Sequence, residues 1–310
     1  MKRKVSIIIP CFNEEQVLPL FWEKLCEVAS GIPDKTFEAV FIDDGSQDAT
    51  LSVIKSLTSE KIKTNYLSFS RNFGKEAALY AGLKAATGDL VVIMDADLQD
   101  PPELLNEMIQ GIEREGYDSV ATRRKDRNGE SVIRSFFAKC FYRIFNYISD
   151  VKIVSGARDY RIMTRQMADA VLELGEYNRF TKGIYSWVGF KTKWIDFENV
   201  QRAAGKTKWS FWTLLLYSLE GICSFSTAPL TLVAGIGISL CSLSFLGISV
   251  VILLKLTGAP AAYGWSSLIC VLFFLSGVQM FCLGILGRYL AKTYLETKHR
   301  PLYIVKEKKD

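Results

Sequence analysis

The first 122 residues alternate short β-branched apolar runs with amphipathic stretches. The apolar runs cover residues 5–10, 37–43, 63–70, 90–95 and 118–122. Patterns with a helical period begin between them, near Glu14, Asp48, Gly74 and Pro101. Strands that alternate with helices in this way predict an α/β domain built on a parallel sheet, with helices on both faces.

Two much longer apolar runs lie near the C-terminus. Residues 229–256 carry no charge before Lys255, and residues 265–287 carry none at all. At a rise of about 1.5 Å per residue, each run can cross a hydrocarbon layer of about 30 Å. Two buried core helices are the alternative, but apolar runs of this length favour transmembrane helices.

The flanking charges predict how these helices are oriented. The link 257–264 is uncharged, whereas five basic residues follow the second run: Arg288, Lys292, Lys298, His299 and Arg300. The positive-inside bias places the link outside and the basic tail 288–310 in the cytoplasm. The apolar run in the N-terminal "MKRKVSIIIPCFNEE" is too short for a signal peptide, so the first domain should stay in the cytoplasm.

We therefore expect a multi-pass protein of the inner (cytoplasmic) membrane. Residues 1–208 would form the cytoplasmic domain, and residues 209–310 the membrane domain. Residues 209–225 contain two tryptophans that suit the headgroup level, which favours an interfacial helix. Residues 131–149 form a basic, aromatic amphipathic pattern that fits either an interfacial helix or an ordinary core-facing helix.

Charge and composition exclude several kinds of site. The chain has a single histidine, and its seven cysteines form no CxxC pair, which argues against zinc sites and histidine-based triads. No GxGxxG follows the first strand and no GxxxxGK[ST] is present, which argues against a dinucleotide cofactor and a P-loop. We expect no nucleic-acid partner, and the oligomeric state stays open, a homo-oligomer included.

The stretch "VVIMDADLQDPPELL" ends a buried strand on a cluster of carboxylates. Such a cluster is unfavourable unless a cation compensates it. Asp95 and Asp97 alternate along an extended segment, so both can face one Mg²⁺ or Mn²⁺, and Gln99 can add a neutral oxygen. Asp100 is explained without a metal, as the cap of a helix that begins at Pro101 and Pro102.

Polar residues follow three other strands as well. Asn13 and Glu14 begin a helix, Asp43 and Asp44 precede the turn at Gly45, and Lys75 follows Gly74 at a helix start that suits a diphosphate. The carboxyl ends of strands in such sheets meet at one edge, where ligands bind. Four polar strand ends therefore predict a single site.

Seven motifs in order resemble the polyprenyl-phosphate glycosyltransferases of glycosyltransferase family two, nearest the bactoprenol glucosyltransferases and more distantly the dolichol-phosphate mannose synthases. They are "IIIPCFNEE", "FIDDGSQDAT", "SRNFGKEAAL", "MDADLQDPPELL", "GARDYRIMTR", "NRFTKGIYSWVGF" and "RAAGKTKWS". The resemblance covers nearly the whole chain and implies a GT-A fold, a UDP-sugar donor, a polyprenyl (undecaprenyl) phosphate acceptor and a metal-dependent transferase.

The resemblance also assigns residues. The metal and diphosphate motif falls on Asp95, Asp97 and Gln99. The nucleotide-sugar positions fall on Pro10, Asn13, Glu14, Asp44, Gly74, Lys75 and Asp95. The catalytic aspartate of the family falls on Asp159, although the preceding Arg158 departs from the usual GDFRLM and changes the local electrostatics.

The acceptor changes what the site must do. A lipid monophosphate is already largely dianionic at neutral pH, so it hardly needs a base, and Asp159 can instead stabilise charge or orient a basic residue. Basic residues near the two amphipathic stretches are candidates for the lipid phosphate: Arg123, Arg124, Arg134 and Arg202. Glucose is the first expectation for the sugar. Modified arabinose, mannose, N-acetylhexosamine, a processive synthase and a non-catalytic nucleotide-sugar sensor are the alternatives.

Overall fold

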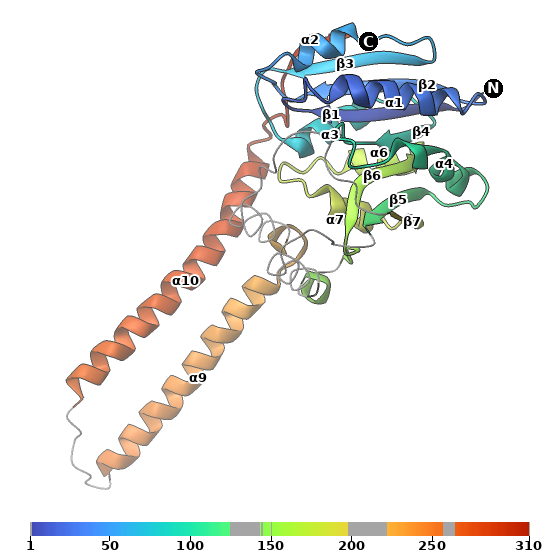
Figure 1. Ribbon diagram of the computed structural model, residues 1–310. Coiled ribbons are helices and arrows are strands. Elements are labelled where there is room, and N and C mark those ends of the chain that lie inside the picture. Colours follow the sequence, from blue (N-terminus) through green and yellow to red (C-terminus); the bar gives the residue numbers. More distant parts are fainter. Residues whose placement is uncertain are drawn as a thin grey trace.

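The computed structural model describes residues 2–124, 143, 145–149, 151–197, 222–256 and 264–309. These residues form an α/β domain from which two long helices project side by side (Figure 1). The interfacial stretches expected at 131–149 and 209–225 lie largely outside the described residues.

One mixed sheet organises the α/β domain. Its described strands run in the order β7-β5-β6-β4-β1-β2-β3-β8. Their bounds are β1 Lys4–Cys11, β2 Thr36–Asp43, β3 Ile62–Phe69, β4 Leu90–Ile93, β5 Ser119–Arg124, β6 Ala157–Thr164, β7 Thr192–Phe197 and β8 Val305–Lys309. Strands β4, β1, β2 and β3 are parallel, as expected, but β6 is antiparallel to β4 and β5, and β8 is antiparallel to β3.

Helices cover both faces of the sheet, as the alternating pattern predicts. One face packs against α1 Leu18–Ser30, α2 Thr50–Ser56 and α4 Leu105–Glu113, which follows the short helix η1 Pro102–Leu104. The other face packs against α3 Lys75–Ala85, α6 Arg165–Glu173 and α7 Thr181–Trp187. Along β1, Ile7 and Ile9 enter the first core and Ile8 the second, because successive strand side chains point to opposite faces.

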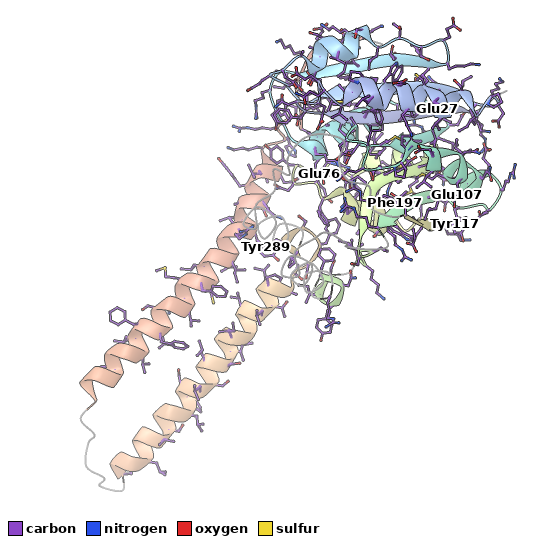
Figure 2. The ribbon with its side chains drawn as sticks, in the orientation of Figure 1. Glu27, Glu76, Glu107, Tyr117, Phe197 and Tyr289 are labelled. Carbon is purple, nitrogen blue, oxygen red and sulfur yellow. The ribbon has the colours of Figure 1, made fainter. Side chains whose placement is uncertain are left out.

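The two long helices are α9 Ala228–Leu256 and α10 Trp265–Thr297. Both are long and apolar enough to cross a membrane. Large apolar side chains on them, such as Phe245 and Phe273, are 75% exposed, as suits contact with lipid. Helix α10 continues past residue 287, where the apolar run ends. Its Tyr289 hydroxyl donates to the Ser226 carbonyl oxygen at 2.7 Å, near the end of the helices closest to the α/β domain (Figure 2).

The chain returns from α10 to the sheet. Residues Val305–Lys309 form β8 at the edge beside β3, so part of the basic tail belongs to the same sheet as the N-terminal strands. Tyr303 stacks on Phe69 with ring centroids 4.9 Å apart, and the Ser70 backbone N–H donates to the Ile304 carbonyl oxygen at 3.0 Å. The tail therefore contacts the segment that leads from β3 to Lys75.

Candidate active site

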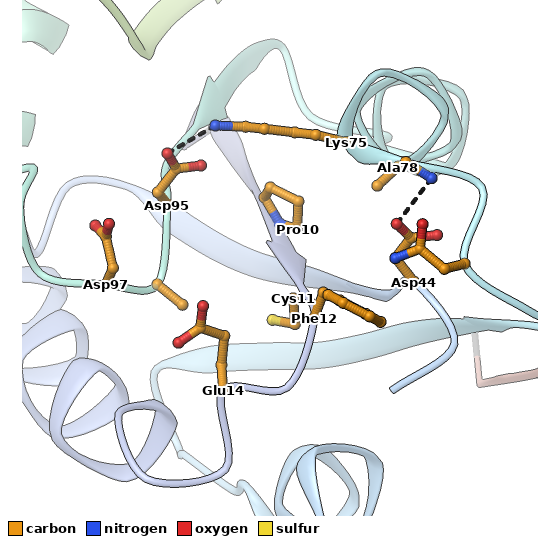
Figure 3. A pocket seen from close by; sticks show the side chains of 12 residues that line it. Pro10, Cys11, Phe12, Glu14, Asp44, Lys75, Ala78, Asp95 and Asp97 are labelled. Atoms are coloured by element: carbon orange, nitrogen blue, oxygen red, sulfur yellow. Dashed lines mark hydrogen bonds and ion pairs between the residues drawn. The ribbon is translucent and has the colours of Figure 1, made fainter. Parts of the chain in front are cut away.

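The carboxyl ends of the parallel strands surround one cavity of about 300 Å³ (Figure 3). Its lining combines residues from all four polar strand ends: Pro10, Cys11, Phe12, Glu14, Asp44, Asn72, Gly74, Lys75, Ala78, Asp95, Ala96 and Asp97. The convergence expected from the strand pattern is thus confirmed. Asp95, Asp97 and Glu14 lie on one side of the cavity and Asp44 on the other, while Lys75 reaches from α3 to Asp95 (Figure 3).

Asp44 holds the loop that precedes α3. Its two carboxylate oxygens accept the backbone N–H groups of Phe73 at 2.6 Å and Gly74 at 2.9 Å. Burial raises the pKa of Asp44, and these two hydrogen bonds oppose that rise. Gly74 has φ +95°, which a residue with a side chain rarely adopts. Asp44 therefore shapes the turn that presents Lys75.

Lys75 bridges two carboxylates from neighbouring strands. Its Nζ lies 2.7 Å from Asp95 Oδ2 and 2.6 Å from Asp159 Oδ2. The antiparallel ladder between β4 and β6 ends at Ile93 opposite Arg161, so Asp95 and Asp159 each lie two residues beyond its end. Burial lowers the pKa of Lys75, but Asp159 and Asp95 outweigh it and raise the pKa above its ordinary value.

A second lysine, which the sequence analysis did not single out, contacts Asp159 from the other side. Lys182, near the start of α7, places its Nζ 3.7 Å from Asp159 Oδ1 and donates to the Ala157 carbonyl oxygen at 3.1 Å. Burial raises the pKa of Asp159, but Lys75 and Lys182 hold it well below its usual range. Asp159 is therefore a carboxylate at any physiological pH.

Arg158 points away from Asp159, because adjacent strand residues face opposite sides of the sheet. Its Nε donates to Asp100 Oδ1 at 2.9 Å, and a terminal nitrogen donates to Gln99 Oε1 at 3.3 Å. Asp100 is completely buried and makes no capping hydrogen bond to the helix that follows, so its expected role as a cap is wrong. Burial raises the pKa of Asp100 to about 6, although Arg158 opposes the shift.

The oxygen donors around the cavity suit a hard divalent cation. Asp95, Asp97 and Glu14 all line it, and carboxylate oxygens are what Mg²⁺ and Mn²⁺ take up. The described ranges contain no group of three or more His, Cys, Asp or Glu side chains close enough to hold a metal ion. Gln99 Oε1 accepts from Arg124 and Arg158, each at 3.3 Å, so it would have to leave both to reach a cation.

The other sequence-predicted residues are distributed around this centre. Pro10 lines the cavity, whereas Asn13 stabilises a neighbouring turn, accepting the Gln47 backbone N–H at 2.9 Å. The guanidinium group of Arg123 forms an ion pair with Asp196 on β7, so it would have to leave this partner to bind an acceptor phosphate. Arg134 and Arg202 lie outside the described residues.

The structure adds a connection between α3 and α7. Glu76 follows Lys75, and its carboxylate accepts both the backbone N–H of Thr181, at 3.1 Å, and the Thr181 hydroxyl. Burial raises the pKa of Glu76, and the hydrogen bonds from Thr181 oppose that rise. Lys182 and Thr181 belong to the motif "NRFTKGIYSWVGF", but no spacing rule in the sequence brings them to Lys75 and Glu76.

A solved structure shares this fold, and known sequences are similar to nearly the whole chain. Mannosyl-3-phosphoglycerate synthase from Rubrobacter xylanophilus has a similar fold, with a TM-score of 0.50 and 18% identity over 71% of this chain and 72% of that one. A prophage bactoprenol glucosyl transferase homolog of Escherichia coli (strain K12) is 41% identical over 306 residues, covering 99% of both chains. The bactoprenol glucosyl transferase of Shigella phage SfV has the same identity and coverage.

The family itself is identified from the N-terminal half of the chain. Residues 6–172 match the family described as Glycosyl transferase family 2. This range contains every described strand end that lines the cavity, together with Asp159. The chain therefore belongs to glycosyl transferase family 2, and the cavity at the carboxyl ends of its parallel strands lies in a glycosyltransferase domain with the expected GT-A fold.

Proposed function

We propose that the protein transfers glucose from UDP-glucose to the phosphate of a polyprenyl phosphate, such as undecaprenyl phosphate, at the cytoplasmic face of the membrane. One observation carries the proposal. The same chain contains the cavity of a glycosyl transferase family 2 domain and two helices long enough to cross a membrane. Two relatives match nearly the full chain. One is named a bactoprenol glucosyl transferase and the other a homolog of one, which supports glucose as the sugar and a polyprenyl phosphate as the acceptor.

The donor would occupy the cavity in Figure 3. Lys75 and the loop fixed by Asp44 provide positive charge and backbone donors for the diphosphate, while Pro10 and Glu14 border the nucleotide side. Asp95 and Asp97 would hold Mg²⁺ or Mn²⁺, with Gln99 as a further ligand after it leaves its arginine partners. A divalent cation held there supplies positive charge to the leaving diphosphate.

The reaction joins a phosphate oxygen of the acceptor to C1 of the sugar, while the bond from C1 to the diphosphate breaks and its electron pair leaves with UDP. A direct displacement of this kind inverts C1. The attacking phosphate needs no proton removed, since its second pKa is about 6. Asp159 would then act as the fixed negative charge that keeps Lys75 in place and that faces the developing positive charge of the sugar ring.

The acceptor phosphate must approach another anion, so it needs cationic partners. Arg123, Arg124, Arg134 and Arg202 are the candidates that the sequence predicts. Arg124 already lies beside Gln99, whereas Arg123 would first have to leave Asp196. Arg134 and Arg202 are outside the described residues; in the sequence, Arg134 falls within the possible interfacial helix 131–149 and Arg202 precedes the one proposed at 209–225, where a lipid phosphate would arrive.

The proposal is tested with purified protein in lipid nanodiscs. UDP-glucose and undecaprenyl phosphate should yield UDP together with a lipid-linked glucose that is released by mild acid. Parallel reactions with UDP-N-acetylhexosamines, UDP-linked modified arabinose and GDP-mannose test the alternative donors. Binding of UDP-sugars without any lipid-linked product would instead favour the sensor hypothesis.

A further inference from the structure

Lys182 is the second lysine that contacts Asp159. Asp159 lies between two lysines, with Lys75 on α3 and Lys182 on α7. Lys75 Nζ lies less than 3 Å from two carboxylates. Lys182 Nζ pairs with only one carboxylate among the described residues, that of Asp159, at 3.7 Å. An ammonium group has three donors, and the Ala157 carbonyl oxygen takes one from Lys182. With respect to the described residues, Lys182 therefore retains donors for a ligand.

Contacts between α7 and α3 position Lys182 relative to Lys75. Thr181 and Lys182 are adjacent on α7, and Lys75 and Glu76 are adjacent on α3. Thr181 donates twice to Glu76 while both lysines contact Asp159, so two interactions tie the helix starts together. The ammonium group of Lys182 therefore lies close to the proposed diphosphate-binding group of Lys75, since both contact the Asp159 carboxylate.

Helix α7 and its N-cap residue also contact the segment that leads into α9. Phe180 packs against Phe145 and Phe225, with ring centroids 6.1 and 6.0 Å away. Phe225 also lies so close to Gly183 that an added Cβ would approach its ring to 2.5 Å. Since Phe225 comes three residues before α9 begins at Ala228, α7 contacts both Asp159, through Lys182, and the segment just before the first long apolar helix.

We propose that the ammonium group of Lys182 binds the phosphate of the lipid acceptor and sets it beside the donor. This inference rests on the proposed function and extends it, because it names a residue outside the predicted arginines. With the acceptor absent, Asp159 is the counter-ion of Lys182. On binding, the phosphate takes the free donors of Lys182, contacting it through oxygens that do not attack C1.

The test measures acceptor binding apart from turnover. Wild type, Lys182→Met, Lys182→Arg and Lys193→Met are compared in nanodiscs for affinity toward undecaprenyl phosphate, undecaprenol and UDP. Lys193 is a matched control, because its side chain is 28% exposed against 27% for Lys182 and it pairs with Glu115 away from the cavity. We expect Lys182→Met to weaken undecaprenyl phosphate binding about tenfold, with undecaprenol and UDP binding unchanged.

Lys182→Arg should retain most of the affinity, and Lys193→Met all of it. The loss caused by Lys182→Met should persist in an Asp159→Asn background, because the contact with phosphate is direct. Equal affinity of wild type and Lys182→Met for undecaprenyl phosphate would overturn the proposal, as would a loss that disappears when Asp159 is neutralised. Wild-type turnover reports separately on the proposed function, since these comparisons need no sugar transfer.

Discussion

Asp159 accepts from Lys75 at 2.6 Å across the end of the β4–β6 ladder, although 84 positions separate the two residues in the chain. This contact makes Asp159 a permanent carboxylate rather than a group that titrates near neutral pH. The contact also connects β6, which carries none of the predicted nucleotide-binding residues, to Lys75 at the start of α3.

The first prediction concerns the pH dependence of transfer. Because the two lysines hold the pKa of Asp159 well below its usual range, the residue stays ionised throughout pH 5.5 to 8. Asp159→Asn should therefore lower the transfer rate by a similar factor at every pH in that range, leaving the shape of the profile unchanged. An acidic limb present in wild type and absent from Asp159→Asn would instead identify Asp159 as a base.

Metal removal provides the second prediction. We expect EDTA to abolish transfer, Mg²⁺ or Mn²⁺ to restore it, and Asp97→Asn to lower it at least about a hundredfold with either metal, because a lost electrostatic contact to the leaving group has that order of effect. Asp169→Asn, an exposed carboxylate on α6 paired with Arg165, is the control. Full activity of Asp97→Asn in metal-free buffer would refute the metal assignment.

Topology can be tested by thiol labelling on intact cells. In a background without native cysteines, a cysteine at Ala261, in the link outside the described residues, should react with an impermeant reagent. A cysteine at Ser46, beside the cavity, should not react until the cells are opened. Labelling at Ser46 with protection at Ala261 would reverse the predicted orientation.

The buried carboxylate of Glu38 supports the opposite end of the sheet from the cavity. It is 1% exposed, pairs with Lys4, and accepts from the Thr87 backbone N–H at 2.8 Å. Burial raises the pKa of Glu38, but Lys4, Ser6 and Thr87 lower it by more. Its contribution to stability is therefore present above the pKa of an unfolded glutamate, about 4.3, and is lost as the pH falls through the folded value.

We accordingly expect Glu38→Ala to lower the free energy of unfolding at pH 7 by about 1–3 kcal/mol, since it leaves the Ser6 hydroxyl and the Thr87 backbone N–H without their acceptor, whereas Lys4 can still contact water. The difference from wild type should shrink as the pH falls below 4. Chemical denaturation at several pH values measures both effects. Glu27→Ala, at an exposed position on α1 (Figure 2), should change stability little, and an equal loss at Glu27 would contradict the assignment.

The last prediction concerns the returning tail. Tyr303 stacks on Phe69, which also packs edge-on against Phe73 in the loop before Lys75. We expect Tyr303→Ala to weaken UDP binding several-fold and to lower stability by about 1 kcal/mol, whereas Tyr303→Phe keeps the ring and both properties. Calorimetric titration with UDP and thermal unfolding check this. Unchanged UDP affinity in Tyr303→Ala would show that the tail does not support UDP binding through the loop before Lys75.

Local patterns were sufficient for much of the catalytic domain. The short β-branched runs predicted β1 to β5, because they alternate with patterns of helical period and β-branched residues favour strands. The polar residues after those strands predicted the cavity, since strands of one direction end at one edge. Strands β6, β7 and β8 were not predicted. They are antiparallel or edge strands, and the regular alternation of strand and helix patterns, on which the prediction rested, ends before them.

The sequence by itself determined the α/β class, the long apolar helices and most residues that line the cavity, because burial pattern and strand polarity are local properties. Only the tertiary structure decided which partner each charge has. Arg158 pairs with Asp100 because neighbouring strand residues face opposite ways, and Arg123 pairs with Asp196 because β5 lies beside β7. Lys182 reaches Asp159 because Thr181 and Glu76 tie α7 to α3, a contact between segments 105 positions apart that no local periodicity encodes.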